Sequence, residues 1–121
     1  MGMDDKINLA EKFARLEGPY KPGIVGYLND YKLQIVKVAG PFVWHRHADT
    51  DDFFLVIEGK LRIQLRDRNV DLGPGELFVV PRGVEHCPTS DEGALVLLIE
   101  PAGTVNTGDA GGELTVAPVE L

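Results

Sequence analysis

The chain has a single cysteine among its 121 residues, so no disulfide can form within it. It also lacks a long apolar run, and no stretch approaches the roughly 20 residues that a helix needs to span a membrane. Its start, MGMDDKINLAEK, is polar and acidic, without the apolar core of a secretory signal. Together these absences predict a cytoplasmic protein without a membrane partner.

Basic clusters are missing as well. Twelve lysines and arginines stand against 19 aspartates and glutamates, which gives a formal net charge of −7. Nucleic acid and anionic membranes bind through positive charge, so neither is expected as a partner. The hydrophobic content of 44% is typical of a globular protein. We therefore expect a single domain over residues 1–121, with a core of its own.

The first pattern along the chain is a short helix. Asn8 can cap its start, with Glu11 three positions later as in a capping box. Leu9, Phe13 and Leu16 repeat at helical spacing and give one apolar stripe. A Gly-Pro pair then stops the pattern. This predicts an N-terminal helix that packs on the surface of the domain.

After this helix and its arm, residues 1–22, the apolar period changes to two. Short runs of strand formers follow, each broken by Gly, Pro, Asn or Asp: residues 24–29, 31–40, 42–47, 52–59, 60–67, 76–81, 85–88 and 94–101. Strands this short, with turns this frequent, predict an all-β sandwich or barrel over residues 23–102. The tail, residues 103–121, is rich in Gly and Thr, and we expect it to wrap loosely, with a short strand at 113–116.

All three histidines of the chain fit one site. In a strand, residues two apart point to the same face, so His45 and His47 project together. Neutral imidazole is the commonest metal ligand in proteins. The carboxylate of Asp52 could turn back to the same point, and His86 follows a turn further along. The pattern favours a metal site; the alternative is a buried, hydrogen-bonded cluster without a metal.

Other side chains have simpler expected roles. Cys87 is expected to be a buried free thiol. The candidates for lining the barrel are Phe54, Val56, Leu33 and Ile35. No lysine or further carboxylate stands out as a base beside the histidines. The sequence therefore predicts a metal site but no proton-transfer step.

One stretch resembles the first motif of the cupins. It runs from Gly40 through His45-x-His47 and Asp52 to Gly59. The family has five residues between the glycine and the first histidine, whereas this chain has four. The family's usual glutamate is replaced by Asp52, which is one methylene shorter.

A second stretch resembles the other cupin motif. Gly75, Pro81, Gly83 and His86 stand at the family's positions, and Ser90 replaces its asparagine. The segment IEPAGTVNTG is also similar to a small bacterial single-domain cupin group, most of whose members lack an assigned activity. Taken together, the two motifs are specific.

The resemblance implies a cupin β-barrel or double-stranded jelly roll with a metal inside one end. His45, His47 and His86 match the family's histidine ligands, and Asp52 matches its carboxylate. Such a ligand set suits iron, manganese, zinc, nickel or copper. The shorter Asp52 leaves open whether its carboxylate reaches the metal; three histidines alone can hold a divalent ion.

The resemblance also frames the function. It implies a metal-dependent enzyme acting on a small organic substrate, with dioxygenase, isomerase or lyase chemistry among the family's activities. A non-catalytic module that binds a small molecule or metal is the first alternative, and a metal-free barrel with an interaction role is the second. Small cupins usually form homodimers, so we expect a homodimer and a small-molecule ligand.

Overall fold

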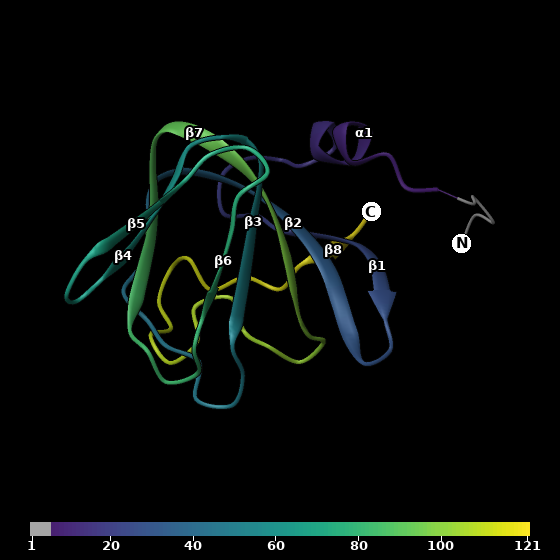
Figure 1. Cartoon of the computed structure of the whole chain (residues 1–121). Coiled ribbons are helices and arrows are strands. Elements are labelled where there is room, and N and C mark those ends of the chain that lie inside the picture. Colours follow the sequence, from purple (N-terminus) through teal and green to yellow (C-terminus); the bar gives the residue numbers. More distant parts are fainter. Residues whose placement is uncertain (1–5) are drawn as a thin grey trace.

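The fold is all-β with one short N-terminal helix, as predicted (Figure 1). The structure is a computed structural model and describes residues 6–121, so the first five residues of the predicted arm lie outside it. Within residues 6–121, no helix combines the length and apolar character needed to cross a membrane. The elements are α1 (Leu9–Ala14), β1 (Gly23–Leu28), β2 (Tyr31–Pro41), β3 (Asp52–Gly59), β4 (Leu61–Leu65), β5 (Asn69–Leu72), β6 (Leu77–Val80), β7 (His86–Pro101) and β8 (Val119–Glu120).

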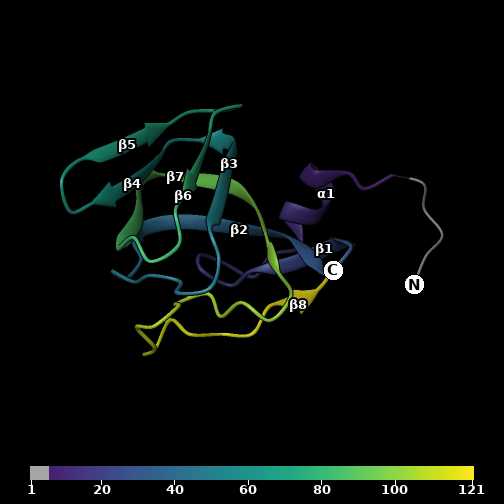
Figure 2. The same ribbon diagram turned by 60° about the horizontal axis from the view of Figure 1, so that its bottom comes forward.

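Strand β7 organises the barrel. It pairs with β2 along most of its 16 residues, while β4 pairs with its first part and β3 with its second part. Strand β5 pairs with β4, and β6 pairs with β3. On the other side of the sheet, β1 pairs with β2, and β8 pairs with β1. All pairs are antiparallel except β1 with β8. Figures 1 and 2 show these strands curving around one interior, with α1 outside the barrel and the yellow tail along one end.

Within the barrel, the predicted strands differ from the structure in three places. Residues 85–88 and 94–101 belong to one strand, β7, rather than two. Strand β5 was missed because its sequence, NVDL, contains the turn formers Asn and Asp. Residues 42–47 form no strand: only His45 makes an isolated bridge, and the N–H of Arg46 donates to the Asp109 side chain instead of to a neighbouring strand.

The tail also differs from its prediction. No strand forms at residues 113–116, and the strand β8 lies later. The reason is the Asn106 side chain, whose amide donates to the carbonyl of Leu114 and accepts from the N–H of Val116. A side chain thereby takes the hydrogen bonds that a partner strand would have made. The Leu114 side chain packs against the barrel core.

The interior of the barrel is built in rows across β3, β7 and β2. Register pairs align Val56, Val96 and Val36 in one row, all of them buried. In antiparallel sheets, side chains directly opposite one another share a face. The part of the barrel interior around this row is therefore filled by apolar side chains. Phe54 and Val56 line it, as predicted.

The predictions for Leu33 and Ile35 were wrong. Both point away from the barrel interior, and Ile35 is fully buried with Phe13 and Leu16 beneath α1. Strand β2 is therefore buried on both faces, so its alternation alone did not indicate which face is inside. The helix itself begins as predicted, with the Asn8 side chain accepting a 3.0 Å hydrogen bond from the N–H of Glu11.

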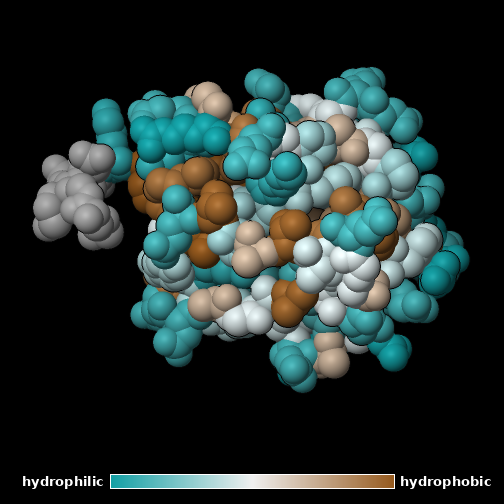
Figure 3. Space-filling view, turned by 180° about the vertical axis from the view of Figure 1, so that it is seen from behind, coloured by the Kyte–Doolittle hydropathy of each residue, from teal (hydrophilic) through white to brown (hydrophobic). Residues whose placement is uncertain are grey.

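Apolar side chains also reach the surface. Figure 3 shows hydrophobic residues gathered on the back of the molecule beside its N-terminal part. Strand β6 is bonded only to β3 among the described strands, so its other edge is free. The large exposed apolar residues are Ile7, Tyr27, Leu28, Tyr31, Ile57, Leu77, Val79, Val84, Val105 and Val119.

Candidate metal centre

The four predicted ligands meet at one end of the barrel. Asp52 and His86 are the first residues of β3 and β7. The backbones of His45 and His86 exchange two hydrogen bonds of 2.9 Å, which tie the loop before β3 to the start of β7. One ligand atom from each of His45, His47, Asp52 and His86 lies within 4.8 Å of the others, and all four residues are buried.

Backbone carbonyls fix the orientation of two imidazole rings. Nδ1 of His45 lies 2.8 Å from the carbonyl of Val43, and Nδ1 of His86 lies 2.9 Å from that of Val84. A carbonyl oxygen can only accept, so each Nδ1 carries a proton. In the neutral ring the lone pair is then on Nε2, the nitrogen available to a metal. This is the arrangement that orients histidine ligands in metal sites.

Asp52 reaches the cluster despite its short side chain. Its Oδ2 lies 3.1 Å from Nε2 of His86 and 3.3 Å from Nε2 of His47. A ring that carries a proton on Nε2 donates it to this carboxylate, and a ring without that proton offers the Nε2 lone pair to a metal. Two ligand atoms about 2.1 Å from one ion are about 3.0–3.4 Å apart in octahedral or tetrahedral sites. The residues therefore fit a metal ion.

The electrostatics differ between the members of the cluster. Burial lowers the pKa of His45 to about 4, so this ring is neutral at pH 7. Burial would raise the pKa of Asp52, but hydrogen bonds and charges from His47 and His86 outweigh it and lower the pKa to about 2. Burial would lower the pKa of His47, but the hydrogen bond and charge of Asp52 outweigh it and raise that pKa. Metal ligands must be deprotonated, a condition that His45 and Asp52 meet at neutral pH, whereas a bound metal would have to displace any proton on His47.

The tail covers this end of the barrel. The Asp109 carboxylate accepts a 2.9 Å hydrogen bond from the N–H of Arg46, and the N–H of Asp109 donates to the carbonyl of Arg46. Gly108 lies so close that an added Cβ would clash with the Arg46 carbonyl and stand 3.1 Å from Cδ2 of His45. The tail, in yellow in Figure 2, thus holds the segment that carries His45 and His47 in place.

Sequence reasoning missed three polar residues inside the barrel. Lys32, Gln34 and Glu100 have exposed fractions of only 2%, 2% and 4%. Lys32 is directly opposite Glu100 in the β2–β7 pair, and Asp52 is one position beyond the Phe53–Ile99 pair of β3 and β7. A lysine and a further carboxylate therefore do lie in the same interior row as a candidate ligand, contrary to the prediction.

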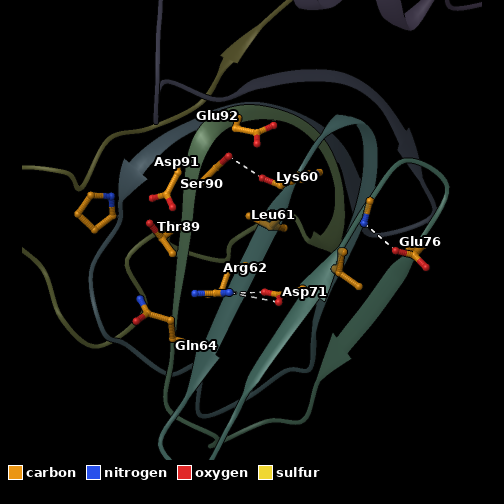
Figure 4. Close-up of a pocket in the computed structure, with 13 residues that line it drawn as sticks. Lys60, Leu61, Arg62, Gln64, Asp71, Glu76, Thr89, Ser90, Asp91 and Glu92 are labelled. Carbon is orange, nitrogen blue, oxygen red and sulfur yellow. Dashed lines mark hydrogen bonds and ion pairs between the residues drawn. The ribbon is translucent and has the colours of Figure 1, made fainter.

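A large surface cavity lies elsewhere. It measures about 830 Å³ and is bounded by β4, β5 and the start of β7, with no candidate ligand in its lining (Figure 4). Several of its polar groups already have partners: Arg62 is paired with Asp71 at 2.7 Å, and the Ser90 hydroxyl donates to the carbonyl of Lys60. Ser90 is thus structural. The cavity offers no unpaired polar group comparable to the interior cluster.

The close approach of Gly108 generates a stability prediction. We expect Gly108→Ala to destabilise the fold by at least about 1 kcal/mol more than Gly111→Ala. Both glycines have positive φ, 53° and 64°, so both substitutions carry the cost of the left-handed conformation, about 1–2 kcal/mol. Only Gly108 would also force its Cβ into Arg46; nothing lies within 4 Å of a Cβ at Gly111.

Urea unfolding followed by the fluorescence of Trp44, the only tryptophan, measures both variants. Trp44 precedes His45 in the chain and therefore reports on the segment that the tail holds. Equal destabilisation by the two variants would mean that the tail is not packed against this segment.

Comparison with known proteins identifies the family. Residues 32–100 match the Cupin domain family. A cupin-2 domain containing protein from Shewanella frigidimarina is 46% identical, with a TM-score of 0.77 over 78% of this chain and 93% of that chain. Protein NMB1881 from Neisseria meningitidis is 30% identical, with a TM-score of 0.74 over 80% of this chain and 99% of that chain.

A curated relative has no assigned function. The uncharacterized protein YdbB of Bacillus subtilis is 30% identical over 63 residues, which are 51% of this chain. The match spans only 56% of that relative's length. The family match covers more than half of the chain, both solved structures share its fold, and each of the two motifs contributes residues to the converging cluster. The protein is therefore a small cupin with the jelly-roll fold, and it carries a buried cluster of three histidines and one aspartate that is typical of a metal site.

Proposed function

We propose that this cupin is a metal-dependent enzyme that acts on a small organic substrate. A divalent transition metal, namely iron, manganese, zinc, nickel or copper, would be held by His45, His47, Asp52 and His86. The observation that carries the proposal is the convergence of four buried side chains from separate parts of the chain. One ligand atom from each of them lies within 4.8 Å of the others.

The residues of the chain are placed to bind and orient an ion. Carbonyls hold the rings of His45 and His86, and the carboxylate of Asp52 would offset part of the charge of a bound metal. Such a metal would supply Lewis-acid polarisation of a carbonyl or hydroxyl oxygen. Burial of the cluster excludes bulk water, which strengthens such electrostatic effects.

The first test is the metal content of protein purified without a metal-affinity tag. Inductively coupled plasma mass spectrometry should find near-stoichiometric metal in the wild type and almost none in His86→Ala. The reason is that His86 provides a ligand from β7 that no other histidine can replace. Wild-type protein that stays metal-free after reconstitution would contradict the proposal and favour a metal-free barrel with an interaction role.

The role of Asp52 is tested by affinity. We expect Asp52→Asn to weaken metal binding at least tenfold, because it removes the only carboxylate in the cluster. Asp49→Asn is the matched control, because Asp49 lies in the loop just before β3, is exposed and is outside the cluster. Competition titration against a chromogenic chelator measures both. Equal affinities of the two variants would exclude Asp52 as a ligand.

The identity of the metal then selects the assay for turnover. Iron calls for oxygen-uptake measurements, whereas zinc or manganese calls for isomerase, decarboxylase and lyase substrates. A protein that binds its metal and a small ligand tightly but turns over no candidate substrate would be the non-catalytic binding module.

We also infer that the chain forms a homodimer. The outer face of β3 and β6 exposes Ile57, Leu77 and Val79, with exposed fractions of 36%, 53% and 41%, next to the free edge of β6. Pairing would bury these side chains and that edge. Size-exclusion chromatography with light scattering should give about twice the chain mass of 13.2 kDa. A Leu77→Lys variant should shift the species to the monomer mass; a wild-type monomer would refute the inference.

A further inference from the structure

The side chains inside the barrel change from apolar to polar along the length of its strands. Beyond the valine row lies a row of Phe54 and Leu98 with Gln34, and beyond that a row of Asp52 and Glu100 with Lys32. The last row begins at the metal cluster, because Asp52 is one of its members. The metal end is thus continuous with a buried polar group inside the barrel.

Two oxygens of this polar group lack partners. Among the buried side-chain nitrogen and oxygen atoms of residues 6–121, only Oε1 of Gln34 and Oε2 of Glu100 have no hydrogen bond. The Lys32 ammonium donates to the carbonyl of Thr104 at 3.0 Å and lies 3.8 Å from Oε2 of Glu100. A buried acceptor without a donor costs roughly 1–3 kcal/mol, so such atoms are rare unless something binds them.

Stability does not explain these residues. The neighbouring rows are filled by valine, phenylalanine and leucine, and an apolar side chain at position 34 or 100 would continue that packing without desolvating polar groups. Buried polar residues that break the local pattern of a fold are expected at functional sites. Both unpartnered atoms are acceptors, so the missing partner is a hydrogen-bond donor.

We propose that Lys32, Gln34 and Glu100 form a ligand subsite of the metal centre, where Gln34 and Glu100 accept hydrogen bonds from a hydroxyl group of a small ligand. Another oxygen of the same molecule is held by the metal ion, so this inference rests on the proposed metal site. Lys32 is a positioning residue that holds Glu100 on the ligand side. The ligand class is a small organic acid or carbonyl compound that carries a hydroxyl group.

The size of the ligand follows from the sheet. Adjacent strands lie about 4.8 Å apart, and residues two apart on a strand about 7 Å. Glu100 lies on β7, one strand away from Asp52 on β3. Gln34 lies on β2, one strand beyond β7, and one row closer to the valine row than Asp52 and Glu100. The hydroxyl and the metal-bound oxygen must therefore be separated by several ångströms, which requires a chain of a few carbon atoms.

The test measures the binding of small acids to cobalt-loaded protein. The visible absorption of Co²⁺ reports each addition to its coordination. The probes are two matched pairs: 3-hydroxypropanoate with propanoate, and 4-hydroxybutanoate with butanoate. For at least one pair, the wild type should bind the hydroxy acid at least tenfold more tightly than its parent acid, because only the hydroxy acid can satisfy the unpartnered oxygens.

Variants of Gln34 and Glu100 test whether these two residues cause the preference for the hydroxy acid. Gln34→Met removes the acceptor at similar volume and should reduce the preference at least fivefold. Gln64→Met makes the same change at the only other glutamine, which donates to the carbonyl of Cys87, and should leave the preference unchanged. Glu100→Gln, which removes the charge and keeps the shape, should reduce the preference as well and provides a second measurement if Gln34→Met does not fold.

The outcomes separate the two proposals. A cobalt spectrum in the wild type without a preference in any pair, or a preference that persists in both Gln34→Met and Glu100→Gln, overturns the subsite and leaves the metal site standing. Absence of a cobalt spectrum in wild-type protein overturns the metal site itself, and the subsite with it. A preference that falls in these two variants but not in Gln64→Met supports the subsite.

Discussion

The pairing of β7 with β2 and β3 is the constraint on which the site depends. Its register places Lys32 opposite Glu100, with Asp52 on the next strand. Side chains alternate between the two faces of a sheet, so a shift of the register by one residue would move this whole set out of the barrel. The same register aligns the valines that fill the other end. One set of backbone hydrogen bonds therefore determines both the core and the polar interior.

The convergence of the four candidate ligands could be predicted because their signal is local and chemical. Histidine is rare in this chain, and two histidines two residues apart with an acidic residue nearby form a pattern that favours a metal site. The four side chains do converge, even though the strand at 42–47 on which the prediction depended does not form. The two rings converge through the isolated bridge to β7 and the carbonyl bonds of their own loop. The motif thus identified the residues, while the assumed backbone geometry was wrong.

The polar residues beside the candidate metal site could not be predicted, since their signal depends on the fold. Lys32 and Gln34 alternate with Leu33 and Ile35, a pattern that ordinarily indicates a polar solvent face. Strand β2 is covered on one side by α1 and on the other by the barrel, so neither face is exposed to solvent. Likewise, the tail is held by side-chain bonds between positions far apart in sequence, such as Arg46 with Asp109. Such contacts between distant positions produce no periodic pattern in the sequence.

The two ends of the barrel differ in what they contribute. Burial of an aliphatic side chain stabilises the fold by about 1.5–3 kcal/mol, and the valine row supplies three such side chains. The end with the histidine cluster does the opposite, because a lysine, two carboxylates and three histidines are desolvated there. The apolar end can offset that cost because β2, β3 and β7 contribute side chains to both ends. Stability and binding are thereby separated along the same three strands, and the polar end is free to keep acceptors that no protein group satisfies.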